Sequence, residues 1–87
     1  MSDDGGVTIR LDHAEALVLG DFLHRHIDLQ DGDQLKPAVK HIGELWALNG
    51  LNCLLERELA EPFLPDYGDR VSKALALLVE RNGNWPK

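Results

Sequence analysis

The chain has 87 residues and a formal net charge of −6, with 44% hydrophobic and 28% charged residues. This composition is ordinary for a folded globular protein, and the length predicts one domain, 1–87, with a single small core. The acidic charge argues against binding to a nucleic-acid backbone, and no apolar run is long enough to span a membrane.

The first eleven residues contain no helical pattern. Residues 1–6 are expected to form a disordered lead, and they lack the basic and apolar regions of a secretory signal. With one cysteine and no export signal, we expect a cytoplasmic location. Residues 7–11 alternate apolar and polar side chains, which predicts an extended segment. Either Val7 and Ile9 lie on the helices, or the segment pairs with its copy in a second chain.

A first helix is predicted over residues 12–27. Asp12 and Glu15 have the spacing of a capping box, in which each side chain accepts a hydrogen bond from the other residue's backbone. The acidic turn that follows, residues 28–33, lacks the alternating oxygen ligands and terminal Glu of a calcium-binding EF-hand loop. We therefore interpret it as a connection to the next helix.

The central helix is predicted over residues 34–61, and its apolar residues occupy two nearly opposite faces. The pattern changes face near Asn49 and Gly50, so a continuous or bent helix is favoured and a break there is the alternative. A helix that is apolar on two sides needs two neighbours, which favours a homodimer. Asn49 either fixes the register between two helices or stays partly hydrated. The interface candidates are Trp46, Asn49, Leu48, Leu51, Leu55 and Leu59.

The last helix is predicted over residues 66–82, where Val71, Ala74 and Leu78 share one face and Gly83 ends the pattern. Residues 84–87 form a tail whose Trp85 is expected to fold back onto the helices. The sequence thus predicts an all-α fold: a small three-helix antiparallel bundle with a long central helix and a short extended segment at the start.

The side chains that could support chemistry are few. His24 with Asp28, and His41 with Glu44, have the helical spacing of half a metal site, and each pair also fits a solvated helix face. Cys53 lies in the middle of a predicted helix on an apolar face and is interpreted as a core residue. No glycine-rich phosphate loop or convergent catalytic set is present, so we expect no enzyme activity, no cofactor and no firm metal site.

Acidic residues gather in two stretches of the chain. Their charge would steer association with a basic protein, and each one singly also fits a solvated surface. The leading hypothesis is a non-catalytic protein-interaction module, in its most specific form an acidic binder of the immunity-protein or antitoxin type. A ligand- or metal-binding protein and a dimeric structural or regulatory protein are the alternatives. The acidic candidates are Asp28, Asp31, Asp33, Glu56, Glu58 and Glu61.

Two phrases of the sequence, EALVL at 15–19 and LERELAEPFLPDY at 55–67, resemble a loose group of short bacterial proteins. The resemblance covers about a third of the chain. Neither phrase is a catalytic motif. The resemblance implies a small bacterial helical protein and nothing about its mechanism.

Overall fold

The computed structural model describes residues 5–86, apart from the side chain of Glu61. It contains no strand within that range, and the predicted all-α fold with three α-helices is confirmed. The α-helices are α1 (His13–Leu23), α2 (Ile42–Glu58) and α3 (Tyr67–Asn82). The helical turns between them are η1 (His24–Asp28), η2 (Asp33–Ala38) and η3 (Glu61–Phe63).

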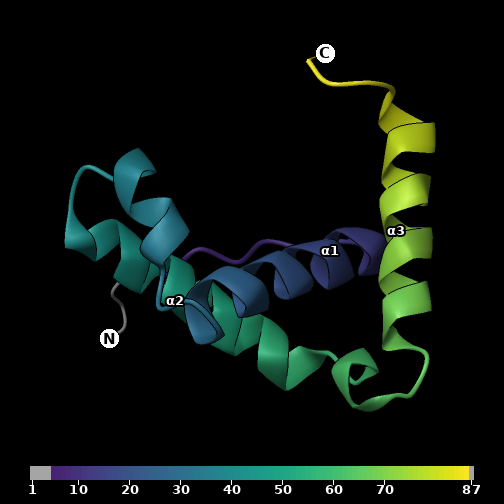
Figure 1. Cartoon of the computed structure of the whole chain (residues 1–87), viewed down its shortest axis with the longest axis horizontal. Coiled ribbons are helices and arrows are strands. Elements are labelled where there is room, and N and C mark those ends of the chain that lie inside the picture. Colours follow the sequence, from purple (N-terminus) through teal and green to yellow (C-terminus); the bar gives the residue numbers. More distant parts are fainter. Residues whose placement is uncertain (1–4, 87) are drawn as a thin grey trace.

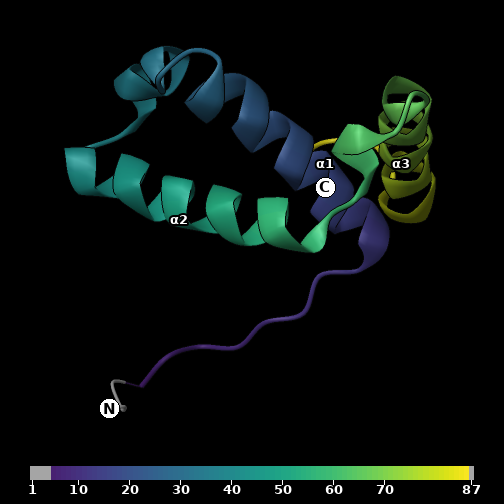
Figure 2. The same cartoon turned by 90° about the horizontal axis from the view of Figure 1, so that it is seen from below.

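Helix α1 contacts both of the other α-helices. It lies beside α2, which runs in the opposite direction, and its beginning is crossed steeply by α3 (Figure 1). From below, α3 is seen nearly end-on while α1 and α2 run across the view (Figure 2). The arrangement is therefore an antiparallel α1–α2 hairpin with a third helix packed across one end.

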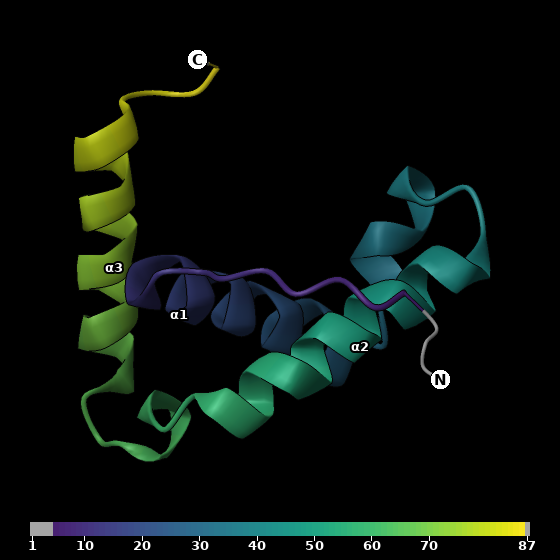
Figure 3. The same ribbon diagram turned by 180° about the vertical axis from the view of Figure 1, so that it is seen from behind.

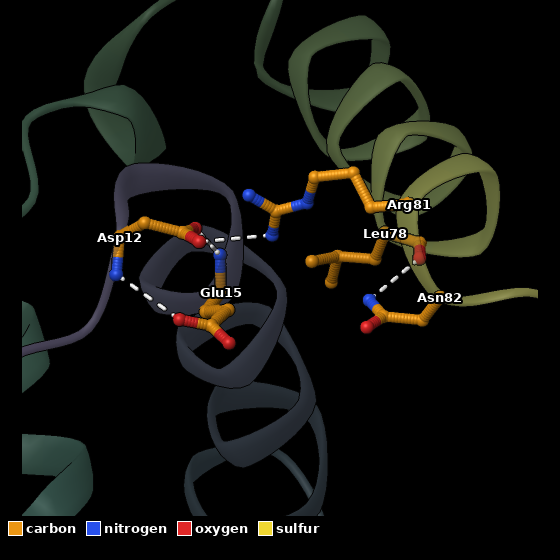
Figure 4. Close-up of polar contacts among 5 residues, drawn as sticks. All are labelled: Asp12, Glu15, Leu78, Arg81 and Asn82. Carbon is orange, nitrogen blue, oxygen red and sulfur yellow. Dashed lines mark hydrogen bonds and ion pairs between the residues drawn. The ribbon is translucent and has the colours of Figure 1, made fainter. Parts of the chain in front are cut away.

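The start of α1 is fixed as the sequence predicts. The Glu15 amide donates to Asp12 Oδ1 over 2.8 Å, and the Asp12 amide donates to Glu15 Oε1 over 3.1 Å. Arg81 Nη2 of α3 also donates to Asp12 Oδ2 over 2.8 Å, so the capping residue ties two helices together (Figure 4). The bond from the Glu15 amide, followed by the bond from Arg81, holds the pKa of the Asp12 carboxyl below its ordinary value.

The central helix begins eight residues later than the predicted start at residue 34. Pro37 has no N–H to donate, and the chain around it forms the 3₁₀ turn η2 and then becomes extended at Val39. Two side chains start α2 anew: His41 Nδ1 accepts from the Gly43 amide, and Glu44 Oε1 accepts from the Lys40 amide, each over 2.9 Å. The predicted start was therefore wrong because the apolar spacing continues through a break in the backbone.

After this break, the predicted continuity of the central helix is confirmed. The helix runs through Asn49 and Gly50 without interruption and is the longest of the three, at 17 residues. It ends at Glu58, three residues before the predicted end, where Leu59 adopts an extended conformation. No break occurs at Asn49–Gly50.

The core consists of two clusters, one on each side of α1. Between α1 and α3 the buried residues are small or medium in size: Ala14, Leu17, Val71 and Ala74. Between α1 and α2 all three are leucines, Leu23, Leu55 and Leu59, with Leu48 and Leu51 partly buried beside them. The central helix therefore packs only one of its two apolar faces inside this chain.

Both ends of the described chain depart from the expected packing. Val7 and Ile9 are 86% and 70% exposed, so they do not lie on the helices as the first alternative held. The segment extends away from the hairpin and runs past α1 and α2 when seen from behind (Figure 2 and Figure 3). Trp85 is 82% exposed, so the expectation that it folds back was wrong.

The described protein is more expanded than its length requires. Its radius of gyration is 14.5 Å. A compact domain of 87 residues has a radius of gyration of about 12 Å. The extended first segment and the steeply placed α3 account for this difference, and both leave surface available for contacts with other molecules.

Candidate functional site: a His–Asp–Glu cluster beside two hollows

Three titratable side chains from two helices converge at the carboxyl-terminal end of α1. His24 and Asp28 lie at the two ends of η1, and His24 Nδ1 is 2.9 Å from Asp28 Oδ2. Glu56 of α2 faces them, and one ligand atom from each of the three lies within 4.8 Å of the other two. We refer to these residues as the His24–Asp28–Glu56 cluster.

The backbone of η1 is a π-helical turn, in which the Leu29 amide donates to the His24 carbonyl five residues earlier. π-Turns are rare and occur frequently at functional sites, because the wider turn changes which side chains face a neighbouring element. Here the turn presents both His24 and Asp28 to α2. Glu56 is one turn after the buried Asn52 and therefore lies on the same side of α2.

Asn52 lies beneath the cluster and is 1% exposed. Its Nδ2 donates to Asp28 Oδ1 over 3.1 Å, which orients that carboxylate. Its Oδ1 is buried and has no hydrogen-bond partner among the described residues. Since an unpaired buried amide oxygen costs free energy, Asn52 is a poor choice for a purely structural core position.

The pKa values of the two carboxyl groups in the cluster are shifted in opposite directions. Burial opposes ionisation of Asp28, but hydrogen bonds from His24, Asn52 and Glu56 outweigh it and lower the pKa of Asp28. Burial and then the negative charge of Asp28 raise the pKa of Glu56. A proton is therefore held more readily on Glu56, which can donate it in a hydrogen bond to Asp28.

The second predicted pair, His41 and Glu44, lies apart from this cluster. Both side chains accept hydrogen bonds from backbone amides at the start of α2, so their spacing serves helix capping. Among residues 5–86 the potential metal-ligand group is His24, Asp28 and Glu56. The sequence offers His24 and Asp28 only as half of a possible site, and it predicts Asp28 and Glu56 as part of an acidic surface.

The signal that could have identified Glu56 is the polar pair Asn52 and Glu56, which follows one side of α2 next to the packed leucines. Four-residue spacing places both side chains together on the helix. Their partner, however, depends on how α1 and α2 are aligned, which the sequence does not state. The pairing across the hairpin was therefore missed.

A hollow of about 470 Å³ lies beside the cluster, between η1 and the beginning of α2. Its apolar lining includes Ile42 and Trp46, which are 66% and 68% exposed. Its rim includes Asp28 and Asp31. We refer to it as the acidic-rimmed hollow, and its lining is Ile27, Asp28, Asp31, Gly32, Ile42, Leu45, Trp46 and Asn49.

The predicted interface residues separate into two groups. Leu55 and Leu59 are buried against α1, and Leu48 and Leu51 are partly buried with them. Trp46 and Asn49 instead lie on the opposite face of α2, in the acidic-rimmed hollow. Cys53 lies further along that face and is exposed, so its interpretation as a core residue was wrong.

The predicted acidic surface is also divided. Asp31 is exposed on the rim of the hollow, and Asp33 forms an ion pair with Lys36 at 3.0 Å. Glu58 is exposed at the end of α2, while Asp28 and Glu56 belong to the cluster. The side chain of Glu61 lies outside the described part of the chain.

A second hollow of about 400 Å³ lies on the other side of the cluster. His24 and Glu56 form part of its wall, with Leu59, Phe63 and Tyr67. The Tyr67 hydroxyl donates to Asp21 Oδ1 over 2.8 Å, and this links α3 to α1. Burial and this hydrogen bond raise the pKa of Tyr67 to about 12, so the phenol is neutral at physiological pH.

Comparison with protein-family models, with curated proteins and with solved structures finds no match. None of the helices within residues 5–86 has the length and apolar character needed to cross a membrane.

Proposed function

We propose that this chain is a non-catalytic protein-interaction module that binds a basic, amphipathic segment of another protein in the acidic-rimmed hollow. The observation that supports the proposal is the exposure of Ile42 and Trp46 directly beside Asp28 and Asp31. An apolar centre with a polar rim is the usual arrangement of a protein interface, and Trp is enriched among the residues that dominate binding energy.

Charge favours a basic partner over a second copy of this chain at this hollow. Two copies would bring their acidic rims together, and each carries a formal net charge of −6. In a segment with Lys or Arg beside apolar side chains, the basic groups would instead pair with Asp28 and Asp31. Its apolar side chains would cover Ile42 and Trp46. In its most specific form, the module is a cytoplasmic acidic neutraliser of a basic protein.

The test uses a fluorescein-labelled amphipathic helical peptide of Leu and Lys, about 18 residues or five turns long. We expect anisotropy to show saturable binding that weakens as salt is raised. Trp46→Ala is expected to weaken binding by at least about tenfold, and Trp85→Ala is the matched control because Trp85 is exposed outside the hollow. Asp31→Asn tests the rim, since Asn also tolerates the positive φ of 53° at this position.

Two results would contradict the proposal. One is equal affinity for a peptide in which every Lys is replaced by Glu while the Leu face is kept. The other is unchanged binding of the Leu and Lys peptide to Trp46→Ala, with helix content preserved by circular dichroism. The first result would exclude selection of a basic partner, and the second would remove the hollow as the binding site.

Self-association is a second candidate function, favoured by the extended segment that projects from the helices (Figure 2). Val7 and Ile9 alternate with polar residues and are exposed, so two copies can pair there as strands. Sedimentation equilibrium should give a mass near twice 9.7 kDa. Replacing both residues by Ser should give a monomer, whereas Phe63→Ser, at an equally exposed site, should not. A monomeric wild type would exclude this candidate.

A further inference from the structure

We propose that the His24–Asp28–Glu56 cluster binds one divalent transition-metal ion, for which zinc is the probe. The site shares Asp28 with the acidic-rimmed hollow, but Trp46 and Asp31, on which the test of basic-segment binding relies, lie outside the cluster. It brings together one imidazole and two carboxylates from different helices, so that a bound ion would also link α1 to α2.

The spacing of the three groups suits a single small cation. Three ligand atoms at about 2.0–2.1 Å from a tetrahedral zinc ion are separated from each other by about 3.3 Å. In the structure the ligand atoms lie within 4.8 Å of one another, and His24 Nδ1 is already 2.9 Å from Asp28 Oδ2. Their side chains are 48% and 33% exposed, so rotation at the surface can close the remaining distance without moving either helix.

The ligand types favour a transition metal over magnesium or calcium. Magnesium and calcium take oxygen ligands, whereas the His24 imidazole suits zinc, nickel or iron. Two carboxylates neutralise the charge of a divalent ion. Three protein ligands leave further positions for water, and His24 and Glu56 present those positions to the second hollow.

Asn52 provides an independent observation that points to a ligand. Its amide is directed at Asp28, is 1% exposed, and has an Oδ1 without a hydrogen-bond partner in the described chain. The unpaired oxygen belongs to the same amide that holds Asp28, so the polar group beneath the cluster lacks one partner in the described chain. Asn52 would meanwhile orient Asp28 through Nδ2, as outer-shell residues orient the ligands of known metal sites. Asn52 is therefore a positioning residue of the proposed site.

The experiment is calorimetric titration of the full chain with zinc at pH 7, repeated with nickel and magnesium. We expect one zinc per chain with micromolar or tighter affinity, similar behaviour with nickel, and no comparable binding of magnesium. Glu56→Gln and His24→Gln should each weaken zinc binding by at least about tenfold, because each removes one of three ligands.

His41→Asn is the matched control, because it removes a histidine outside the cluster and Asn can still cap α2. Its zinc affinity should equal that of the wild type. Zinc should also raise the melting temperature of the wild type and leave that of Glu56→Gln unchanged, since a ligand that binds only the folded state stabilises it. Circular dichroism without metal checks that every variant is folded.

Absence of zinc binding, or unchanged binding by the folded Glu56→Gln and His24→Gln variants, would overturn the proposal. Loss of binding in His41→Asn would also overturn it, because the ion would then be held elsewhere. Trp46→Ala should keep full zinc affinity, so failure of the metal site and failure of the peptide-binding hollow are distinguishable.

Discussion

Helix α1 contacts α3 through small side chains near its beginning, and α2 through leucines and a buried amide near its end. Ala14 and Ala74 allow the backbones of α1 and α3 to approach closely where the two helices cross. Polar bonds at the periphery of the crossing, from Arg81 to Asp12 and from Tyr67 to Asp21, hold it in place. The α1–α2 contact contains Asn52 in its interior.

The difference indicates how structure and binding are divided in this protein. At the crossing with α3, buried residues are apolar and the hydrogen bonds lie outside the core, as stability alone would favour. In the hairpin, a buried amide with an unpaired oxygen lies beneath three titratable groups. Such departures from good packing are expected at functional sites. Both proposed binding regions lie in the hairpin.

Leu23→Ala should cause the largest loss of stability among the variants that test these two contacts. Leu23 is 2% exposed and fills the core between α1 and α2, so its truncation leaves a cavity and should lower the free energy of unfolding by about 3 kcal/mol. Urea denaturation followed by circular dichroism measures the change. Leu54→Ala, at a site 52% exposed on α2, should cost less than about 1 kcal/mol. Equal losses would mean that the hairpin core contributes little.

Tyr67→Phe tests the polar bonds around the α3 crossing. Loss of the hydrogen bond to the Asp21 carboxylate should cost about 1.5 kcal/mol near neutral pH. Because folding raises the pKa of Tyr67 from 10.0 to about 12, this contribution is complete below pH 10 and is lost as the pH rises towards 12. The difference in stability between wild type and variant should shrink over that range. A difference that stays constant with pH would exclude the phenol as its cause.

Two glycine substitutions distinguish the packed side of the hairpin from its open side. A Cβ at Gly50 of α2 would meet nothing within 4 Å, so Gly50→Ala should stabilise the protein by about 0.8 kcal/mol through helix propensity. A Cβ at Gly20 of α1 would lie 2.8 Å from Leu59 Cδ1, so that side chain must move. Gly20→Ala should therefore show no gain, and thermal unfolding compares the two. An equal gain at both positions would contradict close packing at Gly20.

Glu56→Gln should have the smallest effect, and its sign is informative. The pKa of Glu56 is raised in the folded state by burial and by the charge of Asp28, so the ionised side chain opposes folding at neutral pH. The Gln variant should be only slightly more stable at pH 7, because solvent screens the repulsion at this exposed position. That advantage should disappear below the ordinary pKa of 4.5, where Glu56 is protonated in both states. A destabilised variant at pH 7 would contradict the repulsion between the two carboxylates.

Local signals in the sequence predicted much of the fold. The Asp12–Glu15 capping box, the helical spacing up to Asn82 and the uninterrupted passage through Gly50 all depend on residues within a few positions of each other. The break after Ala38 was missed because apolar residues keep helical spacing across it, whereas Pro37 and the capping of α2 by His41 determine the backbone.

Only those parts of the candidate site that lie within one helix could be predicted from the sequence. Four-residue spacing was enough to pair His24 with Asp28, and the apolar pattern placed Trp46 and Asn49 on one face of α2. The position of Glu56 opposite Asp28 depends on the alignment of two helices, and neither propensity nor periodicity defines that alignment. The exposure of Val7, Ile9 and Trp85 could not be predicted either, because nothing in their local sequence distinguishes buried from exposed apolar side chains.

The exposure of both tryptophans has a spectroscopic consequence. Trp46 and Trp85 are 68% and 82% exposed in the folded chain, so their indole rings already experience a largely aqueous environment. Unfolding should therefore change intrinsic emission very little, even when helical circular dichroism is lost. Covering Trp46 with an apolar surface should shift the emission to shorter wavelength, and in a Trp85→Phe background the whole signal would come from that one ring. Tryptophan emission of this protein would thus report association and be nearly silent to folding.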